Sequence, residues 1–176
     1  MIRWPALECR SVGGSRGVID AETFNVEESE RPSSLDAFPV VVRLPIQWGE
    51  LDAYGHVNNT VYLKWFEAAR AVYAARVGVE VIPGTRGVGG ILTSVACKYL
   101  RPLGFPGVVL VGVRISRMSL GSVTLECRIV DAQTGVPAAD ANCDVVFHDY
   151  AAGRLTPIPD PIRAAVEQLE GKRFTS

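Results

Sequence analysis

The residues in this chain that could act together on a substrate gather in one short segment. The stretch 48–70 contains a loop carboxylate at Asp52, a histidine at His56 and the pair Asn58-Asn59. A carboxylate can attack an acyl carbonyl or activate water against it, and backbone amides can hold the oxyanion that forms. The same spacing also fits a loop acid that caps a helix or braces a turn. Hydrolysis of an activated acyl group is therefore one interpretation of the segment, beside a structural one.

The element that must position these groups is a long helix over 60–77. This stretch contains neither Gly nor Pro, and its apolar residues fill two neighbouring rows at helical spacing, which indicates a helix buried on most of its circumference. Asn58 or Asn59 suits its N-cap, and Gly78 suits its end. A helix N-terminus offers free amides and about half a positive charge, so it favours an oxyanion. Asp52 lies seven positions before Asn59, in the loop that feeds this helix.

The rest of the chain predicts a sheet that covers the helix. A β-branched run over 40–48 precedes the loop, and Pro45 places it at a sheet edge or a bulge. This pattern predicts an α+β fold, a curved antiparallel sheet of about five strands wrapped around one long central helix. Such a sheet covers its helix on one side only, so we expect a homo-oligomer. The strands expected after the helix form a meander with hairpin-type turns before a closing helix: 91–100, 108–118, 122–131, 139–150 and then 159–170.

The first 36 residues differ in composition from the rest. They are rich in polar residues and turn formers, and we expect 1–36 to form a poorly ordered N-terminal extension, with one short strand near 17–24, before a domain over 37–176. Gly13-Gly14-Ser15-Arg16-Gly17 spells the nucleophile elbow of α/β-hydrolases. That motif works only at a sharp strand-to-helix turn, and neither element is predicted around it, so we set this role aside.

Composition and charge set aside several classes of function. The net charge is −1 and the pI is near 6.1, which gives no general attraction to nucleic acid or to an anionic membrane. No stretch of about 18 apolar residues could span a membrane, and no secretion signal is recognisable. Four cysteines form no CxxC pair and only two histidines are present. We therefore expect no metal site and a protein of the reducing cytoplasm.

The segment around Asp52 resembles the signature of the 4-hydroxybenzoyl-CoA thioesterase-like family, whose members are hotdog-fold acyl-CoA thioesterases. That signature has an aspartate, a few loop residues, Gly-His-Val-Asn-Asn, and then Tyr and Phe-Glu on the helix. This chain has Asp52, Gly-His-Val-Asn-Asn at 55–59, Tyr62 and Phe66-Glu67 in the same order.

The resemblance covers residues 38–161 and includes two further motifs. Tyr-Leu-Arg-Pro stands at 99–102, and Pro-Ile-Pro at 157–159 is similar to the closing Pro-Leu-Pro of the family. Two positions depart from the pattern. Glu50 replaces the first acid of the Asp-x-Asp that many members carry, and Ala141 stands where the family often has glycine.

The resemblance implies a hotdog acyl-CoA thioesterase that needs no cofactor. Asp52 would be the catalytic carboxylate, as general base or as nucleophile, and the backbone amide of Asn59 would donate to the thioester oxygen. Glu67 is a candidate second acid, for which an ion pair with Arg70 is the favoured alternative. The partners expected are the acyl-CoA substrate and further copies of the chain, a homodimer or homotetramer with the site between subunits. The candidate substrate-binding residues are Trp48, Gly55, His56, Val57, Asn58 and Ser122, of which His56, Asn58 and Ser122 also fit turn or cap roles.

Two other functions remain open on the sequence. One is an acyl-carrier-protein thioesterase, whose partner is a protein rather than a nucleotide, and the other is a non-catalytic module that binds acyl thioesters. Binding of CoA requires cations near the site for its phosphates, whereas the retained Asp52 argues against a non-catalytic module. The available cations, each of which could equally belong to a solvated surface, are Lys98, Arg101, Arg114, Arg117 and Arg154.

Overall fold

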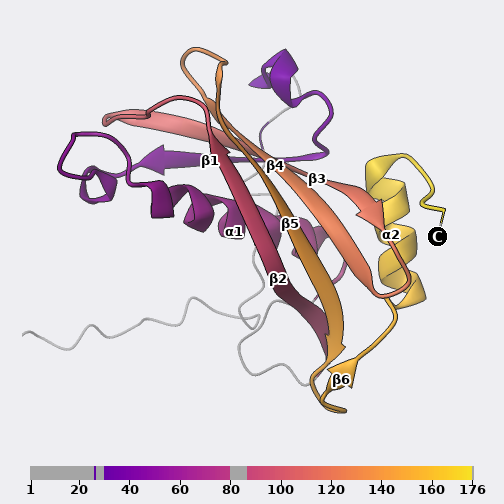
Figure 1. Ribbon diagram of the computed structural model, residues 1–176. Coiled ribbons are helices and arrows are strands. Elements are labelled where there is room, and N and C mark those ends of the chain that lie inside the picture. The colour runs from indigo at the N-terminus through magenta and orange to yellow at the C-terminus, as the bar shows by residue number, and fades with distance from the viewer. Residues whose placement is uncertain (1–25, 27–29, 80–86, 176) are drawn as a thin grey trace, which may run out of the picture.

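The computed structural model describes residues 26, 30–79 and 87–175 (Figure 1). In this part of the chain a curved antiparallel sheet wraps around α1 (Asn59–Arg76), and α2 (Asp160–Glu170) lies at one end of the sheet. The predicted architecture, one long helix enclosed by a curved sheet, is confirmed. The strands are β1 (Val40–Ile46), β2 (Val88–Tyr99), β3 (Gly107–Met118), β4 (Ser122–Asp131), β5 (Pro137–Asp149) and the short β6 (Arg154–Leu155).

The order of the strands differs in one respect from the predicted meander. The order across the sheet is β1-β3-β4-β5-β2, with β6 on β5, so that β3, β4 and β5 form a meander but β2 lies on the far side of β5. β3 already has β1 and β4 as its two neighbours, which leaves no edge for β2 to pair with. The segment from Leu100 to Pro106 therefore crosses over as a long connection, and Leu103 within it is buried in the core.

The boundaries of β1 and α1 follow local chemistry. β1 is an edge strand, as Pro45 predicted, but it ends at Ile46 because Trp48–Glu50 turns into a 3-10 helix. The Glu50 carboxylate accepts the N–H of Gln47 at 2.9 Å and so caps that turn. Asn58, one of the two predicted N-cap residues, is the N-cap of α1, since its side chain accepts the N–H of Thr60.

The core lies between α1 and the concave face of the sheet. Most of the helix circumference is buried, as the two apolar rows predicted, and the exposed stripe contains Lys64, Glu67 and Ala68. None of the described helices is long and apolar enough to cross a membrane. The buried residues of α1 are Val61, Tyr62, Trp65, Phe66, Ala69, Val72 and Tyr73.

A second, smaller apolar cluster lies on the convex face of the sheet. Val26 and Leu35, from the region predicted as an extension, are buried there against β1, β3 and β4. Gly112 of β3 permits this close approach, because a Cβ at that position would lie 2.7 Å from Leu35 and 2.8 Å from Phe38. These contacts attach Val26 and Leu35 to the domain. The division at residue 36 stays a prediction, and both the strand expected at 17–24 and the Gly13–Gly17 motif lie outside the described residues.

Candidate active site

The backbone closes the loop before α1 into a compact turn. Leu51 and Val57 pair as an isolated β-bridge, and within it the N–H of Asp52 donates to the carbonyl of His56 at 2.8 Å. Gly55 donates back to the Asp52 carbonyl at 3.0 Å. Gly55 has a φ of +77°, a conformation that glycine adopts without the strain that a Cβ would add. Since position 51 lies opposite position 57, Asp52 starts beside the residues that open the helix.

The Asp52 carboxylate is oriented by one of its two oxygens. Its Oδ1 accepts the N–H of Tyr54 at 2.8 Å and that of His56 at 3.4 Å. Its Oδ2 has no hydrogen-bond partner among the described residues, and the side chain is only partly buried. The turn-bracing role considered for Asp52 is therefore real. It occupies one oxygen and leaves the other able to act on a substrate.

The first amide of α1 is also left open. The Asn58 side chain accepts the N–H and the hydroxyl of Thr60, at 2.9 and 2.8 Å, and the Asn58 carbonyl accepts the N–H of Val61 at 3.0 Å. Within the described structure the N–H of Asn59 has no acceptor. Because the cap skips this one amide, it is available to an oxygen of a bound molecule at the positive end of the helix dipole.

The end of β2 and the connection that follows it support this helix end. The Tyr99 hydroxyl donates to the Asn59 carbonyl at 3.1 Å, and Val57 donates to the Leu103 carbonyl at 2.9 Å. Tyr62 lies edge-on to Tyr99 with ring centroids 5.2 Å apart, and burial raises the pKa of its hydroxyl. Sequence reasoning used the 99–102 motif only as a sign of family resemblance and missed that it braces the site. Its place at the end of a strand was the one available signal.

The other predicted site residues are distributed unevenly. Trp48 (75% exposed) and His56 lie at the surface of the loop region, whereas Val57 is buried. Ser122 lies at the opposite end of the sheet, because Ile46 pairs with Gly107 at one end of β3 and Met118 pairs with Val123 at the other. There the Ser122 hydroxyl hydrogen-bonds that of Ser119 at 2.7 Å. Within one chain, Ser122 is thus a turn residue and is not brought to Asp52.

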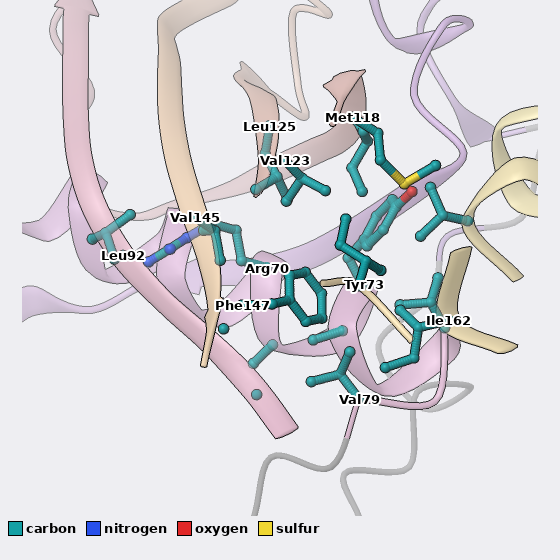
Figure 2. Close-up of a pocket in the computed structure, with 18 of the residues that line it drawn as sticks. Arg70, Tyr73, Val79, Leu92, Met118, Val123, Leu125, Val145, Phe147 and Ile162 are labelled. Atoms are coloured by element: carbon teal, nitrogen blue, oxygen red, sulfur yellow. The ribbon is translucent and has the colours of Figure 1, made fainter. Parts of the chain in front are cut away.

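The ion pair favoured for Glu67 is not formed. Within the described residues, the ion pairs are Arg114–Glu126, Arg117–Asp144 and Arg128–Asp140. Glu67 is exposed, whereas Arg70 extends toward Val145 of β5 (Figure 2). A hydrogen bond from the Cys127 thiol lowers the pKa of the Cys143 thiol, and the positive charge of Arg70 adds to this lowering. The sequence could not show that Arg70 turns inward.

A cavity of about 810 Å³ lies at the other end of α1. Apolar side chains from α1, the sheet and α2 point into it, among them Met118, Phe147 and Ile162 (Figure 2). The Tyr73 hydroxyl donates to the Glu170 carboxylate at 2.7 Å, and the same carboxylate accepts the N–H of Ile115 at 2.6 Å. Burial, together with this acceptor, raises the pKa of Tyr73 far above its usual range. Sequence reasoning missed this cavity, since no short motif marks it.

Comparison with known proteins finds thioesterases by family model and by structure. Residues 46–166 match the family model of the thioesterase-like superfamily. A thioesterase from Thermus thermophilus, solved with coenzyme A and Zn, is 31% identical with a TM-score of 0.71, over 79% of this chain and 99% of that chain. A thioesterase-superfamily structure from Jannaschia sp. CCS1 is 26% identical with a TM-score of 0.73, over 80% and 88% of the two chains.

The name of one curated relative gives acyl carrier protein, and not CoA, as the carrier of its substrate. The chloroplast acyl-acyl carrier protein thioesterase ATL2 of Arabidopsis thaliana is 27% identical over 124 residues, which is 70% of this chain. The chain spans 65% of the length of that relative. Among the described residues, no group of His, Cys, Asp and Glu side chains gathers that could hold a metal ion.

Proposed function

Because the chain belongs to the thioesterase-like superfamily and has its hotdog fold, we propose that it hydrolyses an acyl-CoA thioester at Asp52 and the N-terminus of α1. Thioester hydrolysis in general follows from the family. The acyl-CoA substrate and the roles of single residues are our proposal. The observation that carries it is the junction of loop and helix. Among the described residues, one oxygen of the Asp52 carboxylate and the N–H of Asn59 have no hydrogen-bond partner, and the Leu51–Val57 bridge joins the two segments that hold them.

In the proposed reaction, the N–H of Asn59 donates to the thioester carbonyl oxygen. The free Asp52 oxygen takes a proton from water, hydroxide adds to the carbonyl carbon, and the Asn59 amide holds the resulting oxyanion. The C–S bond then breaks, and the CoA thiolate receives the proton, which releases a free acid. The alternative course is direct attack by Asp52, which forms a mixed anhydride that water then hydrolyses. Hydrolysis in ¹⁸O-labelled water under single-turnover conditions tests for direct attack. General-base catalysis places one ¹⁸O in the product, whereas a product without ¹⁸O requires an anhydride that water opens at the carboxyl carbon of Asp52.

The distribution of cations supports a CoA site at this end of the molecule. Of the candidate cations, Arg114 and Arg117 are paired with carboxylates, whereas Lys98 and Arg101 flank Tyr99, which holds Asn59. Both are exposed. We therefore assign the phosphates of CoA to Lys98 and Arg101, with Trp48 and His56 as exposed neighbours in the loop region.

We propose that the active form is at least a homodimer that pairs through β2. This strand is an edge of the sheet, twelve residues long, and exposes Leu92, Val95 and Tyr99 at 42%, 43% and 45%. A long, apolar, unpaired edge is unfavourable in water and readily pairs with a second copy. Antiparallel pairing with the partner's β2 would extend the sheet and place the site between subunits. Light scattering that shows a stable and active monomer would contradict this assembly.

Acyl-carrier-protein thioesterase activity is the second candidate, and its specific support is the similarity to the Arabidopsis enzyme. The two candidates differ in what binds outside the acyl group, since CoA presents phosphates and the carrier presents a protein surface. We place the activity in the cytoplasm, because Cys127 and Cys143 are buried in the core, where single cysteines serve as small apolar residues of the kind that proteins of a reducing compartment contain.

The experiment that tests the function is a comparison of carriers. The purified protein should release thiol from a panel of short, long and aromatic acyl-CoAs, and for one fixed acyl group its kcat/KM on the CoA thioester should exceed that on the acyl carrier protein. The reverse preference would favour the carrier-protein function. Binding of acyl-CoA without turnover of any member of the panel would leave only the non-catalytic module.

A further inference from the structure

Arg70 occupies an unusual place for a charged residue, on the wall of the large cavity. Of the described residues that line the cavity, only Glu67 and Arg70 are charged, and nearly all others are apolar. Arg70 is partly buried and extends from α1 across the cavity, with its nitrogen atoms in the direction of Leu92 and Val145 (Figure 2). Burying a guanidinium against such a wall is unfavourable unless something pairs with it.

No carboxylate of the described chain neutralises Arg70. Arg114, Arg117 and Arg128 each have an acidic partner on the convex face of the sheet, but Arg70 has none within ion-pair distance. The Cys143 thiol is one polar neighbour of Arg70, since the charge of Arg70 helps the hydrogen bond from Cys127 to lower the pKa of that thiol. A thiol is a weak acceptor, so the planar fork of the guanidinium retains donors that face the cavity. A ligand that complements these donors would present a carboxylate, which can accept two of them at once.

The cavity lies at the wrong end of α1 to serve the Asp52 of its own chain. Tyr73 in the cavity wall follows Asn59 by 14 residues, a rise of about 21 Å along the helix. β2 runs between the same two places. Tyr99 at its end holds Asn59, while Gly89, Gly90 and Leu92 at its start line the cavity.

Pairing of β2 with its copy resolves this separation. In an antiparallel pair that is centred on the middle of the strand, the end of one β2 lies beside the start of the other. The partner's Asn59 would then lie at the mouth of this chain's cavity, and an acyl group bound at that amide would extend toward Arg70. The cavity volume, about 810 Å³, falls in the usual range for a small-molecule site.

We propose that Arg70 is a specificity-determining residue that pairs with a carboxylate at the far end of the acyl group, so that the preferred substrates are CoA monothioesters of dicarboxylic acids. This inference rests on the proposed function and on the β2 pairing. Arg70 recognises the substrate and takes no part in the hydrolytic steps at Asp52.

The test compares adipyl-CoA with hexanoyl-CoA, whose acyl chains have equal length and differ in the terminal carboxylate. The native protein should have the higher kcat/KM on adipyl-CoA. In Arg70→Met the ratio of the two kcat/KM values should fall by about 10- to 100-fold, the usual effect of losing a hydrogen bond to a charged group. Arg70→Lys should retain part of the ratio, since it keeps the charge but loses the fork. The matched control is Arg43→Met, the same change at an exposed position of β1, which should leave the ratio unchanged.

The outcomes separate this inference from the function beneath it. The inference is wrong, and the thioesterase function stands, if the kcat/KM of the native protein on hexanoyl-CoA equals or exceeds that on adipyl-CoA. The same holds if Arg70→Met keeps the native ratio of the two kcat/KM values. If the native protein hydrolyses neither thioester, the proposed function fails and this inference fails with it. The native preference can be measured without any variant, so a poorly folding Arg70→Met would not remove the test.

Discussion

The two ends of α1 are built in different ways. At the N-terminal end, backbone hydrogen bonds within a few consecutive residues hold Asp52 and leave the amide of Asn59 open. At the C-terminal end, side chains from both helices and four strands meet around a cavity, and a hydrogen bond from Tyr73 to Glu170 joins the two helices. The first region can hold a reacting group rigidly, whereas the second can change its shape and polarity one side chain at a time. Chemistry and substrate selection can therefore vary independently in this fold.

The largest expected effect comes from removing the hydrogen bond between Tyr73 and Glu170 at the cavity end of α1. Glu170→Ala leaves the Tyr73 hydroxyl and the N–H of Ile115 without their shared acceptor. Each such loss costs about 1–3 kcal/mol when the group is buried, so we expect the free energy of unfolding to fall by about 2–4 kcal/mol. Urea denaturation measures this. Glu167→Ala is the control one turn earlier, because Glu167 accepts only a 3.3 Å bond from the Phe174 amide, and a loss as large there would contradict the account.

A smaller effect is expected at the loop end. Gly55→Ala puts a Cβ at a φ of +77°, which should cost about 1 kcal/mol and tilt the turn that orients Asp52. We expect kcat to fall roughly 10-fold, because catalysis depends on a well-positioned carboxylate. Gly153→Ala makes the same change at a φ of +66° in the turn before β6, also in open space. This variant should lose a similar free energy of unfolding and keep the native kcat. Equal losses of kcat in both variants would contradict the link between the Asp52 turn and catalysis.

How far the sequence could go differs between these two regions for a physical reason. The loop site is local, so Asp52, Gly55, Asn58 and Asn59 could be placed relative to one another from a single stretch of chain. The cavity depends on which strands lie side by side, and the sequence misplaced β2 because its pairing is set by the neighbours of β3 and not by a turn. Patterns of apolar residues predicted that α1 is buried, but they could not show that Arg70 faces inward instead of pairing with Glu67.

The smallest effect is expected from the exposed cations that we assign to the phosphates of CoA. Changing Lys98 and Arg101 together to Ala should raise KM for an acyl-CoA by about three- to tenfold, as expected for the loss of exposed contacts to phosphates, with kcat nearly unchanged. For the matching acyl-pantetheine, which lacks the nucleotide, KM should not change. An equal rise in KM for both thioesters would show that these cations do not bind the phosphates.

The central claim is that the free oxygen of Asp52 performs the chemistry, and Asp52→Asn tests it most directly. Asparagine keeps a side-chain oxygen that can accept the N–H groups of Tyr54 and His56, so the turn should survive. It cannot act as base or nucleophile. We expect kcat on the best acyl-CoA to fall by about 100-fold or more, with KM little changed. Glu67→Gln is the comparison, since Glu67 is the other candidate acid. An active Asp52→Asn beside a folded but inactive Glu67→Gln would contradict the account and move the chemistry onto α1.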